Sequence, residues 1–146
     1  MSAADGLFTA AEREAMMARA AEVRAQKEGA RGAAKRARDR AAFDEAVAGM
    51  GAEDRALIEP IAEIIGLLGP DLDPRTMYGM PAWARDGTVL CFFQAAGKFG
   101  TRYASFGFQP TAALDEGEMW ATSFAVTGMG EGTRRRIAEL VTRALA

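Results

Sequence analysis

The chain has 146 residues, of which 49% are hydrophobic and 26% charged, and it carries a net charge of −2, one cysteine and no histidine. The length suits one hydrophobic core, and the composition is that of an ordinary globular protein. Without histidine, serine–histidine and cysteine–histidine nucleophilic pairs are excluded, and one cysteine cannot form an internal disulfide. No apolar run is long enough to cross a bilayer and no secretory signal is recognisable, so we expect a cytoplasmic protein without a membrane partner.

Residues 1–42 are rich in alanine and charge, and we expect them to form a helical arm. Thr9 and Glu12 have the spacing of a capping box, and an alanine-rich run with high helix propensity follows. These signals predict a helix over residues 10–28 that ends near Gly29. Residues 30–41, which contain glycine and five basic residues, are expected to form a hinge or a solvated continuation of this helix.

The apolar stripe of the expected arm is narrow, so this helix buries little surface by itself. A second copy of the chain would give the stripe a partner, and a homodimer through the arm is therefore one hypothesis. Five basic residues gather between residues 31 and 40, but Asp39 lies among them and the whole chain is acidic. A nucleic-acid partner is accordingly disfavoured. The stripe consists of Met16, Ala20 and Val23.

Residues 43–146 are expected to form the folded domain, and they open with helical patterns. Phe43, Val47 and Met50 have helical spacing, with Gly51 as a stop signal. Residues 53–69 form a stronger amphipathic pattern, in which Pro60 either kinks the helix or lies in its first turn. The apolar face of this second helix comprises Leu57, Ile61, Ile64, Ile65 and Leu68.

Asp86-Gly87 is the strongest turn signal in the chain. It separates residues 82–85 from residues 88–94, and this dipeptide favours a two-residue hairpin whose central positions both need positive φ. The turn pairs Arg85 with Thr88 and places Trp83 opposite Leu90. Because residues 89–93 are apolar throughout, we expect their strand to be central and covered on both faces.

Three further extended segments and a last helix complete the expected fold. Residues 76–80, 99–108 and 119–126 are expected to be extended, and the helix begins near Glu131 or Thr133. The segregation of helices and strands predicts an α+β fold with a small antiparallel sheet of four to five strands. The apolar face of the last helix comprises Ile137, Leu140, Val141, Ala144 and Leu145.

A series of short motifs follows in a fixed order from residue 53 to the end of the chain. They are Met77-Tyr78-Gly79-Met80-Pro81-Ala82-Trp83, Asp86-Gly87, Cys91-Phe92-Phe93-Gln94, Lys98-Phe99, Arg102-Tyr103, Leu114-Asp115, Met119-Trp120 and Leu140-Val141. In these motifs the chain resembles the YdhG-like family of small bacterial domains, most of unknown function. The resemblance implies an antiparallel sheet flanked by helices, and some relatives are described as frataxin-like iron chaperones.

Two cations carry the leading functional hypothesis, a non-enzymatic module that binds a small anionic ligand and requires no cofactor. Lys98 and Arg102 have the same parity on the expected strand, which places them about 13 Å apart on one face with Gly100 between them. Four aromatic side chains are expected to wall the pocket. They are Tyr78, Trp83, Tyr103 and Trp120.

The alternative is an intracellular iron-binding chaperone that uses carboxylates alone. Asp115, Glu116 and Glu118 follow one another closely, and carboxylate oxygens are ligands for hard cations. Without histidine or thiolate ligands such a site would hold iron weakly. An enzyme with Tyr78 or Lys98 as acid or base has the least support, and Cys91 in its apolar strand is expected to be a core thiol with no catalytic role.

Overall fold

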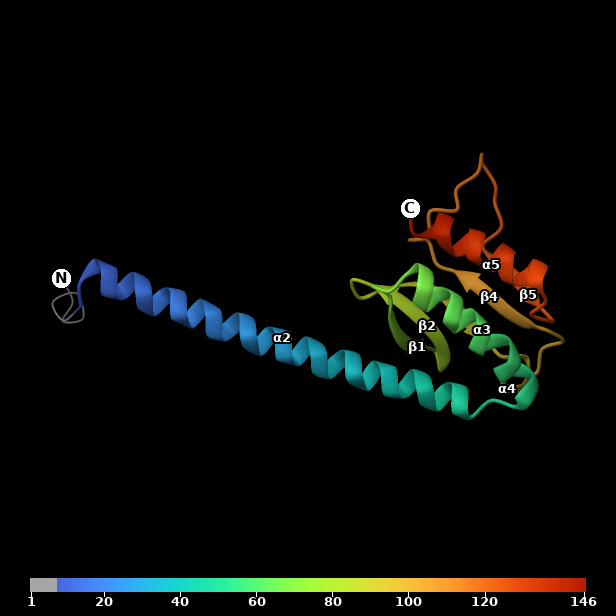
Figure 1. The fold of residues 1–146 in the computed structure, drawn as a ribbon, viewed down its shortest axis with the longest axis horizontal. Helices are drawn as coiled ribbons and strands as arrows, with labels where there is room; N and C mark the ends of the chain where they lie inside the picture. The colour runs from blue at the N-terminus through green and yellow to red at the C-terminus, as the bar shows by residue number, and fades with distance from the viewer. Residues whose placement is uncertain (1–7) are drawn as a thin grey trace. The chain divides into compact units, whose positions relative to one another are not determined.

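The computed structural model describes residues 8–146 and orders them as a long helix, a five-stranded antiparallel sheet and further helices (Figure 1). The expected α+β class is confirmed. The elements are α2 (Ala10–Ala48), α3 (Ala52–Leu68), β1 (Asp73–Met77), β2 (Met80–Arg85), β3 (Thr88–Gln94), α4 (Ala96–Phe99), β4 (Ala104–Phe108), β5 (Ser123–Val126) and α5 (Glu131–Ala144). None of the helices within residues 8–146 combines the length and the apolar character that a bilayer-spanning segment needs.

Helix α2 begins as the capping box predicts, because the Thr9 hydroxyl accepts a hydrogen bond from the Glu12 amide at 3.1 Å. The predicted end near Gly29 is wrong, since the helix continues to Ala48. Each interior glycine costs about 1 kcal/mol relative to alanine, but the flanking residues are mostly alanine, lysine and arginine, which favour the helix. The short helix expected after Phe43 is therefore the last part of α2.

The chain divides into two compact units, one that ends at Ala37 and one from Arg38 to Ala146. In the described part of the first unit, residues 8–37, the side chains are exposed except at Val23, which is half-buried. The second unit contains the sheet, α3, α4 and α5 together with the end of α2.

The sheet has the strand order β1-β2-β3-β4-β5, with every neighbouring pair antiparallel. The hairpin at Asp86-Gly87 is confirmed, with Arg85 paired to Thr88 and positive φ at both turn residues. Trp83 pairs with Cys91, however, not with Leu90. A register shift between Trp83 and Ala84 gives β3 one extra residue, and such a bulge moves every pair beyond it by one position.

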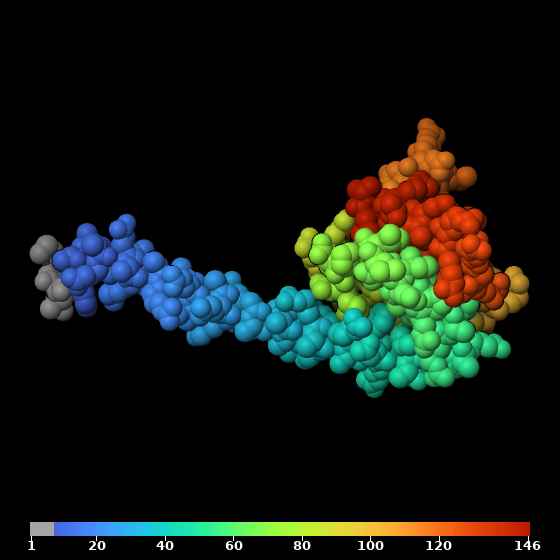
Figure 2. All heavy atoms as spheres, viewed as in Figure 1, coloured from blue at the N-terminus to red at the C-terminus, as the bar shows by residue number. Residues whose placement is uncertain are grey.

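Helices α3 and α5 lie side by side on one face of the sheet (Figures 1 and 2). They bury a core in which Phe43 meets Trp83 edge to face at 5.3 Å between ring centroids. The other face is more open, since Phe92 of β3 is only half-buried there and its ring lies against Gly107 of β4. Strand β3 is central as predicted, and on this second face Phe92 is covered only in part.

Helix α3 matches its predicted range and runs through Pro60 in its interior. Ile58, Ile61 and Ile65 are buried, whereas Leu68, assigned to the same face from the sequence, is exposed. Cys91 is fully buried in β3, and burial raises the pKa of its thiol above the ordinary value. The thiol therefore stays neutral and is a core group, as predicted.

The predicted strand over residues 99–108 is wrong in its first part. Residues Ala96–Phe99 form the short helix α4, which ends at Gly100 with a φ of +65°, and β4 begins only at Ala104. The segment expected to be extended from residue 119 is likewise a loop as far as β5, which begins at Ser123. Residues 100–103 and 119–122, which were assigned to the sheet from these patterns, therefore lie in loops, and Phe99 lies in α4.

Candidate functional site

The turn between β1 and β2 has an unusual backbone. Met77 pairs with Met80, so Tyr78 and Gly79 are the two central residues of a tight turn, with φ of 50° and 77°. The prediction that residues 76–80 are extended is thus wrong at the turn. A non-glycine residue with positive φ is uncommon and unfavourable, and Asn-Gly is the preferred sequence for such a turn. Tyr78 is 88% exposed, so packing of its side chain does not offset the energetic cost of this backbone conformation.

Replacing Tyr78 by asparagine is expected to raise the free energy of unfolding by about 0.5 to 1 kcal/mol, because asparagine tolerates the left-handed conformation better than tyrosine. Urea denaturation of the full chain would measure the change. Tyr78→Phe is the control and is expected to leave stability unchanged, since it keeps the aromatic ring and the same backbone preference. A loss of stability in Tyr78→Asn would show that the tyrosine side chain stabilises the fold.

The side chain of Lys98 is hydrogen-bonded to this turn. Its Nζ donates a hydrogen bond to the Gly79 carbonyl at 3.1 Å and lies 5.5 Å from the centre of the Phe99 ring. The approach is close enough that a Cβ at position 79 would lie 2.7 Å from Nζ. Glycine at position 79 therefore allows both the turn and the position of the Lys98 ammonium group.

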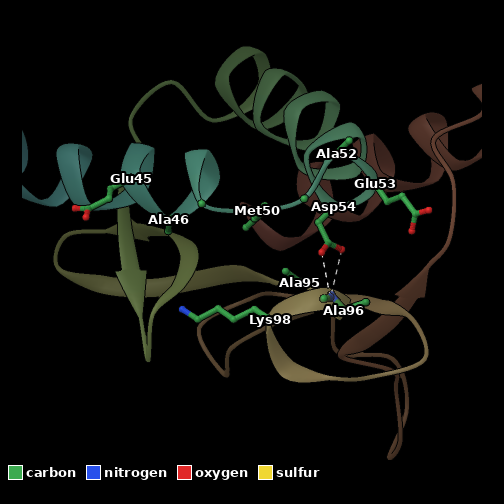
Figure 3. A pocket seen from close by; sticks show the side chains of 12 residues that line it. Glu45, Ala46, Met50, Ala52, Glu53, Asp54, Ala95, Ala96 and Lys98 are labelled. Carbon is green, nitrogen blue, oxygen red and sulfur yellow. Dashed lines mark hydrogen bonds between the residues drawn. The ribbon is translucent and has the colours of Figure 1, made fainter.

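Lys98 also lines a groove of about 840 Å³ within the second unit. The groove lies between the end of α2, the connection to α3, the first turn of α3 and the segment that leads into α4 (Figure 3). Its walls are mostly small residues. The lining residues are Glu45, Ala46, Gly49, Met50, Gly51, Ala52, Glu53, Asp54, Ala95, Ala96, Gly97 and Lys98.

Asp54 holds the two sides of the groove together. Its carboxylate accepts hydrogen bonds from the Ala96 amide at 3.1 Å and the Gly97 amide at 3.0 Å (Figure 3). It is 8% exposed and is the one buried charged side chain among residues 8–146. Because this carboxylate already occupies the first amides of α4, those amides are not available to a ligand.

The charges of the groove are mixed. Lys98 is the one cation among the lining residues, whereas Glu45 and Glu53 are exposed carboxylates. The Asp54 charge is directed onto the two backbone amides. Such a lining can neutralise one anionic group of a ligand at Lys98, and the exposed carboxylates oppose a ligand with several negative charges.

The structure does not bring the six predicted ligand residues together. Lys98 lies in α4 and Arg102 in the loop that follows it, so the two do not share a strand. Arg102 instead lies 5.0 Å from the Tyr103 ring centre. Both residues line a neighbouring hollow of about 500 Å³, which shares Glu53, Asp54 and Ala96 with the groove but does not include Lys98. The expectation of one anion site with two cations on a strand face is therefore wrong.

The remaining aromatic side chains are dispersed as well. Trp83 is 3% exposed and belongs to the core, where it contacts Phe43. Trp120 lines a third hollow, of about 630 Å³, on the loop before β5. Tyr78 shares the Lys98 region only through the backbone of its turn. No aromatic pocket is thus formed by Tyr78, Trp83, Tyr103 and Trp120.

The carboxylates of the alternative iron site do not come together in the structure either. Within residues 8–146 no three carboxylate or thiol side chains come close enough to hold a metal ion. Asp115 and Glu118 line the hollow beside Trp120, while Glu116 approaches Arg143 at 3.8 Å. The three carboxylates follow one another in sequence but do not converge on a single point.

Sequence reasoning missed most of the groove. The Gly49-Met50-Gly51 sequence signals a chain reversal, but no local signal indicates that Ala95–Lys98 lies opposite it. The connection is made by Asp54, which lies more than forty residues before the amides that it binds. In the sequence, Asp54 lies in the first turn of the helix expected over residues 53–69, and nothing in the local pattern distinguishes it.

Comparison with models of protein families, with curated proteins and with solved structures gives no match to this chain.

Proposed function

We propose that the second unit is a non-enzymatic module that binds a small molecule with one anionic group, such as a carboxylate, in the groove beside Lys98. The observation that carries the proposal is the Lys98 ammonium group, fixed by the Gly79 carbonyl at the wall of a groove of about 840 Å³. A cation that is already held in place loses less conformational entropy when a ligand binds.

The same groove narrows the chemistry of the ligand. Its walls of alanine, glycine and Met50 favour a small, partly apolar body. Glu45 and Glu53 favour an ammonium group on that body and disfavour nucleotides and other polyanions. Amino acids and related zwitterions combine an anionic group, a small body and an ammonium group, so they are the proposed ligand class.

A thermal-shift screen tests the proposal on the full chain. The panel contains small amino acids, monocarboxylic acids, inorganic phosphate and nucleotides. A ligand that binds only the folded state stabilises it by about 2.7 kcal/mol at one hundred times its dissociation constant. We expect Tm to rise with a member of the amino-acid class and to stay unchanged with nucleotides. No rise with any member of the panel would contradict the proposal.

Lys98→Ala and Arg102→Ala form a matched pair, because both remove an exposed cation near α4 but only Lys98 lines the groove. The ligand-induced rise in Tm is expected to disappear in Lys98→Ala and to persist in Arg102→Ala. Equal loss in both variants would indicate a general charge effect, and persistence in Lys98→Ala would place the ligand elsewhere.

The YdhG-like resemblance stays a prediction, as does the location of the protein in the cytoplasm. An iron chaperone has weaker support than the ligand module, because the carboxylates at residues 115–118 do not converge. Iron belongs in the same screen as a further test, and a rise in Tm with ferrous or ferric ion that is lost in Glu118→Ala would favour the chaperone.

A further inference from the structure

The first unit contains a surface that the proposed ligand site does not explain. Helix α2 is exposed along residues 10–37 except at Val23 and Gly32. A helix that is exposed on every side gains little stability from packing. One face of this helix nevertheless carries a stripe of apolar and alanine side chains that only Lys27 interrupts. The stripe recurs at alternating intervals of four and three residues, at positions 16, 20, 23, 27, 30, 34 and 37.

This spacing is the seam of a coiled coil, in which a side chain of a second helix inserts between four residues at i, i+3, i+4 and i+7. The structure has a shallow, open depression on α2 that includes one such set, Met16, Arg19, Ala20 and Val23. Ala15 and Arg24 complete its lining. The small side chain of Ala20 leaves the space, and Met16 and Val23 supply apolar walls.

The positions beside the seam determine which partner fits. Between residues 17 and 33 these flanking positions hold Met17, Arg19, Arg24, Gln26, Arg31 and Ala33, with three arginines and no acidic residue. Lys27 lies within the seam itself. The acidic residues Glu22 and Glu28 lie outside both the seam and its flanks, although Arg19 reaches Glu22 at 3.3 Å in an exposed ion pair. Exposed pairs of this kind are weak and exchange readily.

We propose that α2 docks an acidic amphipathic helix of another protein along the stripe from Met16 to Ala37. Acidic residues at the partner's flanking positions would pair with Arg24 and Arg31, and one acidic residue in its seam would pair with Lys27. A second copy of this chain fits less well, because either orientation of two α2 helices brings arginine beside arginine and places Lys27 in an apolar seam without an acidic partner. Nucleic acid offers phosphate but no apolar stripe for Met16 and Val23.

The test uses the full chain and two synthetic helical peptides of four heptads. Both carry leucine and alanine at the seam positions, with one glutamate in the seam, and they differ only in having glutamate or lysine at every flanking position. Isothermal titration calorimetry measures binding. We expect the glutamate peptide to bind at least tenfold more tightly than the lysine peptide. Equal affinity for the two peptides would overturn the proposal.

Charge reversal provides the specificity control. The variant Arg19→Glu/Arg24→Glu/Arg31→Glu is expected to prefer the lysine peptide, with helix content checked by circular dichroism. Arg36→Glu reverses a charge away from the seam and is expected to keep the original preference, as is Lys98→Ala, which separates this surface from the ligand groove. An unchanged preference in the triple variant would contradict the proposal.

A second copy of the chain and nucleic acid are the two alternative partners of this stripe, and each predicts a different experimental result. Light scattering of the full chain at micromolar concentration is expected to give a monomer, and a dimer that dissociates in the triple variant would assign the stripe to a second copy. Binding of duplex DNA in competition with the glutamate peptide would assign the surface to nucleic acid. Either result would overturn the acidic-helix partner.

Discussion

Replacement of Asp54 by alanine is expected to lower the free energy of unfolding by about 3 kcal/mol. The carboxylate is buried and accepts two backbone hydrogen bonds, at 3.1 and 3.0 Å. Hydrogen bonds to a charged group contribute about 1.5 to 3 kcal/mol each, and the loss of this acceptor leaves both amides of α4 without it. The expected effect is a large fraction of the stability of a small domain.

Urea denaturation of Asp54→Ala measures the loss, and Glu53→Ala is the matched control. Glu53 is the preceding residue in α3 and is exposed, so its removal is expected to change stability by no more than about 0.5 kcal/mol. Asp54→Asn keeps one oxygen acceptor and is expected to lie between the two. Equal stabilities of Asp54→Ala and Glu53→Ala would contradict the role assigned to Asp54.

Asp54 also links stability to the ligand site. It anchors Ala96 and Gly97, and Lys98 is the next residue along the chain. If α4 loses this anchor, the Lys98 ammonium group loses its fixed position beside Gly79. A folded Asp54→Asn variant is therefore expected to bind the groove ligand more weakly than the wild-type chain.

Trp83→Ala is expected to destabilise the fold by about 4 kcal/mol, the usual cost of removing a large aromatic side chain from a core. Trp83 is 3% exposed and contacts Phe43 edge to face, so its loss leaves a cavity between β2 and the end of α2. From the sequence, Trp83 was expected to form part of the wall of the ligand pocket. The structure places Trp83 in the core, so an effect on folding is expected.

Trp120→Ala is the comparison for the core tryptophan. Trp120 is 37% exposed on the loop before β5, and its removal is expected to cost about 1 kcal/mol or less. Thermal unfolding followed by circular dichroism measures both variants. Similar losses of Tm in the two variants would contradict the placement of Trp83 in the core.

Local patterns were sufficient for the elements that depend on local physics. The spacing of Ile61 and Ile65 predicted α3, Asp86-Gly87 predicted the central hairpin, and Ile137 and Val141 predicted α5. Each of these signals lies within one element or one turn. The sheet and the fold class followed from them.

The candidate groove did not follow, because distant contacts create it. The residues around position 100 were interpreted as a strand. The hydrogen bonds that the Ala96 and Gly97 amides donate to Asp54, together with the positive φ of Gly100, explain why a helical turn forms there. With that turn, Lys98 moved from the expected sheet face to the groove and Arg102 to another hollow. Tyr78 and Gly79 were also misread, since Tyr-Gly is a weaker turn signal than Asp-Gly.

The most direct measurement is a two-dimensional NMR titration of the ¹⁵N-labelled full chain with glycine as the probe, which has one carboxylate and one ammonium group. The account predicts saturable shifts of the amides at Gly49, Gly51 and Ala95–Lys98, and loss of these shifts in Lys98→Ala. Shifts confined to Arg102 and Tyr103, or to the loop around Trp120, would contradict the groove as the binding site, and no shift at millimolar glycine would contradict the proposed ligand class.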